Sequence, residues 1–242
     1  MAPLFANREE PTVGIVQHLG ATRLDVGIGN AMDIVSWEGT DNTLGCGIDF
    51  FAYALAENIS GYQLKIAAAD GFFGLHVSFS ASDSWQLRFR ALHFSAHLVD
   101  GLYDPEGNTW KGGKEPIPFS RNFGEVVVAH LWGNTVLKGR VYAGFAVAPW
   151  VKPVAIRSWS CLAGVELHGS VEGQPYLAYN ISLLGVPSYI ATNTVQAGVK
   201  FGTWYGKGLR LFVTYQNGLD PFGQYYDVRV NYAGVGFCFD FW

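Results

Sequence analysis

The feature that most constrains this chain is an alternation of apolar and polar residues with a period of two. In the segment 135–147, Leu137 and Val141 fall on one face and Lys138 and Arg140 on the other. The same alternation runs through most of the sequence, interrupted by clusters of Gly, Asn, Asp and Pro, and helical periodicity is nearly absent. A period of two is typical of β-strands with one apolar face. The chain is therefore expected to fold into β-sheet.

Two architectures produce such strands: a soluble sandwich or barrel with an apolar interior, and a membrane barrel with an apolar exterior and a polar lumen. Strand length separates them, because strands in soluble proteins usually run about 5–6 residues, whereas a strand that spans a bilayer needs about 9–11. Most of the alternating segments exceed the longer range, which favours the membrane. No uninterrupted apolar run approaches the roughly 20 residues of a membrane helix, so strands have to carry any membrane role.

The number and spacing of the strands indicate a barrel. We expect strands near residues 10–18, 22–38, 43–57, 62–80, 84–98, 120–131, 135–149, 154–169, 173–186, 190–204, 207–219 and 224–242. The connections SASDS, WGNT and YGKG are brief, whereas the alternate ones include the long VDGLYDPEGNTWKGGKEPIP. Short turns on one rim, on the periplasmic side, and long loops on the other are typical of outer-membrane barrels.

The prediction is therefore an all-β fold, a transmembrane antiparallel up-and-down β-barrel of about twelve strands. We expect residues 1–242 to form a single domain. An even number of strands leaves both termini in the periplasm, where residues 1–10 would form an N-terminal segment.

Charge excludes one class of partner and predicts a lumen. The chain has only 16 Lys and Arg residues and a formal net charge of −4. Nucleic-acid binding needs clustered cations, so no nucleic-acid partner is expected. The charged residues of the strands are instead expected to face the lumen and to pair across it: Asp49, Lys65, Asp70, Arg88, Arg90, Lys138, Arg140, Glu166, Lys200, Arg210, Asp227 and Arg229.

The strand WQLRFRALHFSAHL (85–98) carries the candidate chemistry. Arg88 and Arg90 must face the lumen, because facing lipid near the bilayer midplane would cost about 2–4 kcal/mol for each. If the alternation continues unbroken, His93 and Ser95 then face lipid near the rim with the long loops. A β-bulge around residues 90–92 would reverse the phase, turning both into the lumen and four apolar residues outward. Hydrophobicity alone favours the bulged register, and both registers remain open.

A third polar residue is expected beside this pair. The next strand runs antiparallel, so Trp85 lies near His130 or Leu131, and counting back brings Asn122 next to His93 and Ser95. In that arrangement His93 would take the proton of the Ser95 hydroxyl, while Asn122 would fix the imidazole tautomer. The alternative is a structural role in a polar lumen network.

Three segments carry a resemblance to a known family: PLFANREEP near the start, the strand HFSAHLVD, and YQNGLDPFGQYYDVRVNYAGVGFCFDF near the end. Together they are similar to an uncharacterised family of bacterial outer-membrane proteins. The alternating aromatic ending GVGFCFDFW also resembles the C-terminal signal by which bacterial barrels are recognised for insertion into the outer membrane of Gram-negative cells.

More distantly, the pattern resembles outer-membrane phospholipase A, a barrel with a lipid-facing His-x-Ser motif. The resemblance implies Ser95 as nucleophile, His93 as base, Asn122 as orienting residue and Asp100 in a calcium-associated loop. It implies hydrolysis of phospholipid acyl esters, with outer-membrane lipids as partners and a homodimer or contacts with other outer-membrane proteins. The competing hypothesis is a non-enzymatic barrel serving as a small pore, envelope scaffold or subunit of an outer-membrane complex; a soluble β-sandwich module is the third.

Overall fold

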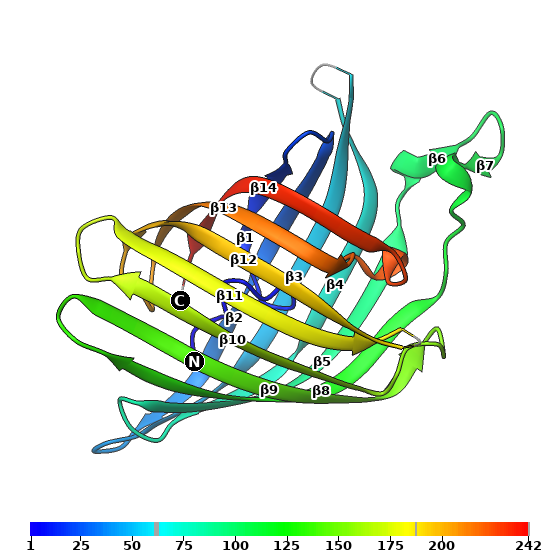
Figure 1. Cartoon of the computed structure of the whole chain (residues 1–242). Helices are drawn as coiled ribbons and strands as arrows, with labels where there is room; N and C mark the ends of the chain where they lie inside the picture. The colour runs from blue at the N-terminus through cyan, green and yellow to red at the C-terminus, as the bar shows by residue number, and fades with distance from the viewer. Residues whose placement is uncertain (61–62, 187, 242) are drawn as a thin grey trace.

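The chain folds into a closed antiparallel β-barrel (Figure 1). A computed structural model describes residues 1–60, 63–186 and 188–241. Within them the barrel order is β1-β14-β13-β12-β11-β10-β9-β8-β5-β4-β3-β2, with β1 paired to β14, and β6 and β7 form a separate two-stranded sheet. The barrel strands are β1 (Val13–His18), β2 (Arg23–Glu38), β3 (Thr43–Ser60), β4 (Gln63–Ser80), β5 (Trp85–Leu98), β8 (Phe119–Gly133), β9 (Leu137–Lys152), β10 (Trp159–Gly169), β11 (Gln174–Gly185), β12 (Tyr189–Gly202), β13 (Gly208–Leu219) and β14 (Arg229–Asp240).

The predicted all-β barrel of about twelve strands is confirmed: the described residues form twelve barrel strands, with membrane-spanning lengths in all but β1. Two predicted strand starts are wrong. β10 begins at Trp159 rather than near residue 154, and β14 begins at Arg229 rather than residue 224. The reason for the second is a short 3-10 helix, η3 (Gly223–Tyr225), which folds into the barrel mouth.

The described residues contain no helix long and apolar enough to cross a membrane.

The two rims differ. One rim carries the long connection between β5 and β8, which contains η1 (Asp100–Leu102), β6 (Tyr103–Asp104), β7 (Thr109–Trp110) and η2 (Lys111–Gly113). Figure 1 shows this hairpin projecting beyond the barrel, beside the extended ends of β3 and β4. We call this end the long-loop rim. The other end, where short turns join β2 to β3 and β4 to β5, is the short-turn rim.

Buried ion pairs hold the lumen together. Arg90 lies 2.7 Å from Glu125, and Arg140 lies 2.6 Å from Glu166. Of the charged residues predicted to face the lumen, eight are buried there: Asp49, Asp70, Arg88, Arg90, Arg140, Glu166, Lys200 and Arg210. The prediction that Asp227 faces the lumen is wrong. It lies in the connection before β14 with a half-exposed side chain, 3.7 Å from Lys114.

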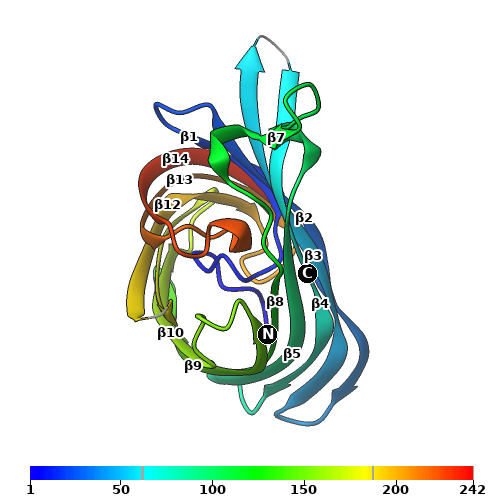
Figure 2. The same ribbon diagram turned by 90° about the vertical axis from the view of Figure 1, so that its right-hand side faces the viewer.

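The predicted location of the N-terminal segment is also wrong. Residues 1–10, expected in the periplasm, lie inside the barrel, and Figure 2 shows the N-terminus within the ring of strands. Arg88 donates to Glu10 at 2.9 Å, Arg121 donates to Glu9 at 2.7 Å, and the Phe5 amide donates to Glu166 at 2.8 Å. The lumen cations therefore bind carboxylates of this segment as well as those of other strands.

The connection between β13 and β14 folds into the lumen at the long-loop rim. Phe222 is fully buried, the Gly223 amide donates to Asp70 at 3.0 Å, and the Gln224 side chain donates to the Ala96 carbonyl at 2.7 Å. Phe222 belongs to an apolar cluster that includes Phe72, Phe94 and Phe119. Near this rim the barrel interior is therefore a hydrophobic core.

The buried ion pairs predict a large effect of removing one partner. In Glu166→Ala, the fully buried Arg140 loses its carboxylate partner, which should lower the free energy of unfolding by about 3–5 kcal/mol. Denaturant unfolding of the barrel in lipid vesicles measures this change. The exposed Glu172 provides a matched control, and Glu172→Ala should change the free energy little. Equal stability of the two variants would contradict the assignment.

Candidate functional site on the outer barrel face

The register of β5 settles which way its polar residues point. Burial alternates without a break from Trp85 to Leu98, and the pairing of β5 with β4 and with β8 is continuous. Leu92, Phe94, Ala96 and Leu98 are buried inside the barrel. His93 and Ser95 therefore lie on the outer face, and the bulged register is wrong. Its appeal rested on the assumption of a watery lumen, whereas these apolar side chains pack in the hydrophobic core around Phe222.

His93 and Asn122 are in contact across β5 and β8. The two residues are direct cross-strand partners, the pairing that counting along the strands predicts. The His93 Nδ1 donates to the Asn122 Oδ1 at 2.5 Å. With the proton held on Nδ1, the Nε2 of the same ring carries the lone pair and is the atom able to act as a base.

Ser95 lies one step along the same face. Same-face neighbours two residues apart on a strand are about 7 Å apart at Cα, and no described contact joins the Ser95 hydroxyl to the His93 ring. A catalytic hydrogen bond of this kind often tightens only once substrate is bound. Beside Ser95 on β4 is Gly71, where an added Cβ would sit 3.8 Å from the Ser95 hydroxyl oxygen. The hydroxyl is therefore uncovered on its β4 side.

Aromatic side chains flank the His93–Asn122 row. Phe73, the β4 partner of His93, has its ring centroid 4.7 Å from that of His93, and Trp150 of β9 is the partner of Asn122. Both aromatics are exposed on the outer face. His97 shares this face but is the cross-strand partner of Ala69, with no polar residue opposite it on β4. The arrangement singles out His93 as the histidine with an orienting partner.

Asp100 does not complete a described metal site. Its backbone begins η1, two residues after the last residue of β5, but its side chain lies outside the described part of the structure. The described residues contain no group of three or more His, Cys, Asp or Glu that could hold a metal ion. Calcium also takes carbonyl and hydroxyl oxygens as ligands, so the calcium expectation stays a prediction.

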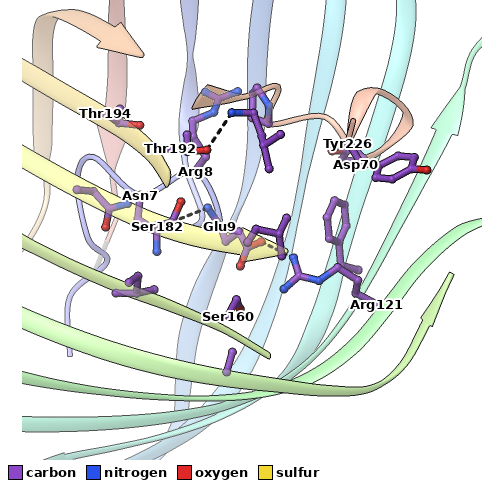
Figure 3. A pocket seen from close by; sticks show the side chains of 18 of the residues that line it. Asn7, Arg8, Glu9, Asp70, Arg121, Ser160, Ser182, Thr192, Thr194 and Tyr226 are labelled. Carbon is purple, nitrogen blue, oxygen red and sulfur yellow. Dashed lines mark hydrogen bonds and ion pairs between the residues drawn. The ribbon is translucent and has the colours of Figure 1, made fainter. Parts of the chain in front are cut away.

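A cavity lies on the other side of the same wall. It has a volume of about 100 Å³ and is lined by the N-terminal segment, by Phe94 and Arg121, and by hydroxyls of β10 to β12 such as Ser182 (Figure 3). Because a buried water needs about 10–15 Å³ of such cavity volume, this space has room for several waters. His93 and Ser95 lie on the opposite, outer side of this wall.

Three residues of the outer face were not identified from the sequence. Ser120 is the β8 partner of Ser95, Lys152 of β9 is the partner of Ser120, and Gly71 completes this row on β4. Ser120 lies two residues before Asn122 and therefore on the same face of β8. This two-residue spacing from Asn122 could have identified Ser120 from the sequence.

Comparisons with known proteins match both the sequence and the fold. Residues 58–241 match the family model described as Protein of unknown function (DUF1207). A search of curated protein sequences gives no match. Among solved structures, outer membrane phospholipase A from Escherichia coli is similar at a TM-score of 0.52 and 11% identity, over 96% of this chain and 90% of that chain.

A second structure of the Escherichia coli phospholipase, an active-site mutant with asparagine replaced by alanine, gives a TM-score of 0.54 at 11% identity. The match covers 100% of this chain and 92% of that chain. These likenesses show an outer-membrane barrel fold. They do not extend to activity.

The outward register predicts opposite responses of adjacent residues. Ser95→Leu replaces a hydroxyl on the lipid-facing surface with an apolar side chain, and it should leave the free energy of unfolding unchanged or higher. Ala96→Leu adds atoms to a site that is 1% exposed and should lower the free energy by about 1–3 kcal/mol. Denaturant unfolding in vesicles compares the two variants. A larger loss for Ser95→Leu than for Ala96→Leu would contradict the register.

Proposed function

Since the chain belongs to the DUF1207 family, whose function is unknown, we propose a function from the chemistry of the outer barrel face: an outer-membrane acyl hydrolase acting on phospholipid esters. The observation that carries the proposal is the His93–Asn122 contact on the outer face, two residues from Ser95. A polar pair that served only to stabilise the fold would be expected in the lumen. A pair that acts on membrane lipid has to lie on the outer face. The proposed catalytic residues are Ser95, His93 and Asn122.

The reaction would proceed by acyl transfer. The Ser95 oxygen attacks the ester carbonyl carbon as its proton passes to the His93 Nε2, and the carbonyl electron pair moves onto its oxygen. Collapse of this intermediate breaks the bond to the glycerol oxygen, which takes the proton from His93. Water then attacks the acyl-serine by the same route, with His93 as base, and releases the fatty acid.

Asn122 would keep His93 in the reactive tautomer. Its amide oxygen accepts the Nδ1 hydrogen, which orients the ring and holds the lone pair on Nε2. A neutral amide stabilises the imidazolium less than a carboxylate would. Slow or regulated turnover is therefore expected.

The location of the site supports a lipid substrate. The outer barrel face is apolar, with Phe73, Leu75 and Phe89 exposed around the polar row. In the proposed orientation the long-loop rim is extracellular, and acyl chains of the outer membrane would lie directly against these residues. A convex barrel wall offers no groove of its own, so a homodimer that builds one stays part of the proposal.

The described residues include no group of three or more His, Cys, Asp or Glu that could hold calcium, and the acyl transfer above uses only Ser95, His93 and Asn122. Asp100 remains the proposed residue at which calcium dependence would arise.

The competing function is a non-enzymatic envelope scaffold, and the filled interior favours it over a pore. The N-terminal segment and the connection between β13 and β14 both occupy the lumen, where Leu4 and Phe222 are buried. A scaffold of this kind would need no polar row on its outer face.

Hydrolysis of phosphatidylethanolamine in mixed micelles tests the proposal. The chain should release fatty acid, Ser95→Ala should release none, and Asn122→Ala should lower kcat by about 100-fold because the ring loses its orienting partner. Ser182→Ala, which alters a hydroxyl on the lumen side, is the matched control and should retain activity. The assay is run with and without calcium. Equal release by the chain and Ser95→Ala would refute the enzyme and leave the scaffold.

A further inference from the structure

The backbone amides around Ser95 are used by the sheet. The Val99 amide donates to the Ala67 carbonyl at 3.0 Å. Hydrogen-bonded pairs recur at every second residue of an antiparallel ladder. His97 is opposite Ala69 and Ser95 is opposite Gly71, so both amides also donate to β4.

The remaining amide in this stretch points the other way. Ala96 is opposite Phe119 of β8, and by the same alternation its amide donates to that strand. Each backbone donor from Ser95 to His97 is therefore engaged. Serine hydrolases commonly stabilise the oxyanion with backbone amides, so this site needs a different donor.

A side-chain donor lies directly beside the nucleophile. Ser120 is the β8 partner of Ser95, on the same outer face. Because the hydrogen-bonded pairs of β5 and β8 fall at Ala96 and Phe94, Ser95 and Ser120 form a non-hydrogen-bonded pair, with Cα atoms about 4.5 Å apart. The same class of pair joins His93 to Asn122, whose side chains do meet, at 2.5 Å.

We propose that Ser120 is a further catalytic residue: its hydroxyl donates a hydrogen bond to the oxyanion formed when Ser95 attacks the ester. This assignment rests on the proposed acyl hydrolase. The two cross-strand neighbours of Ser95 have different roles. Gly71 leaves space for the substrate on the β4 side, and Ser120 supplies a hydrogen-bond donor on the β8 side. No proton is transferred to or from Ser120.

Lys152 is the other side-chain donor in this row, one strand farther from Ser95 than Ser120 is. It is the β9 partner of Ser120, so its Cα lies two strand spacings, about 10 Å, from that of Ser95. Because Lys152 reaches this row from the next strand, we assign its ammonium group to the phosphate of the same lipid and not to the oxyanion. Its removal should therefore raise KM and leave kcat nearly unchanged.

Steady-state hydrolysis of phosphatidylethanolamine by the full chain tests the assignment. Ser120→Ala should lower kcat by about 100-fold with little change in KM. Ser120→Thr keeps a hydroxyl and should recover most of the rate. The Lys152→Met and Ser182→Ala variants serve as comparisons, and denaturant unfolding checks that each variant folds.

The possible outcomes distinguish a failure of the Ser120 assignment from a failure of the proposed hydrolase. If Ser120→Ala keeps the full kcat while Ser95→Ala has none, the hydrolase stands and the role of Ser120 is refuted. A kcat loss in Lys152→Met in place of Ser120→Ala, or equal losses in the Ala and Thr variants, refutes it as well. If the unmodified chain releases no more fatty acid than Ser95→Ala, the hydrolase and the role of Ser120 fall together.

Discussion

The ion pair between Arg90 and Glu125 determines which way the candidate site faces. Both side chains are buried in the lumen, 2.7 Å apart, and neither could face lipid without a large free-energy cost. Fixing Arg90 inward fixes every alternate residue of an unbroken β5, which turns His93 and Ser95 outward. The same pair fixes β8, because Glu125 inward makes Asn122 outward. One buried charge pair thus orients all three polar residues.

The long-loop end of the barrel shows why an unbroken strand is stable there. Leu92, Phe94 and Ala96 would be poorly placed in a watery lumen, but they pack against Phe222. The connection between β13 and β14 supplies the apolar cover, and Asp70 and Ala96 hold it through hydrogen bonds with Gly223 and Gln224. The lumen core therefore allows polar residues to occupy the outer face.

Sequence patterns predicted the strands and much of the site, for a physical reason. Alternation with a period of two reports the two faces of a strand directly, and counting along neighbouring strands predicts Asn122 opposite His93, as the structure has it. Patterns could not report what fills the lumen. The position of residues 1–10 depends on long-range pairs such as Arg88 with Glu10, and that of Phe222 depends on the fold of a loop. Without those, the choice between two registers of β5 stayed open, and Ser120 was overlooked.

Covalent labelling of the unmodified chain tests the central claim, that Ser95 is a nucleophile activated by His93. A long-chain alkyl sulfonyl fluoride would sulfonylate an activated serine with loss of fluoride. Trypsin then releases residues 91–111, in which Ser95 is the only serine. We predict one sulfonyl adduct on this peptide by mass spectrometry, absent from His93→Ala. An unlabelled peptide, or labelling that persists in His93→Ala, would contradict the account.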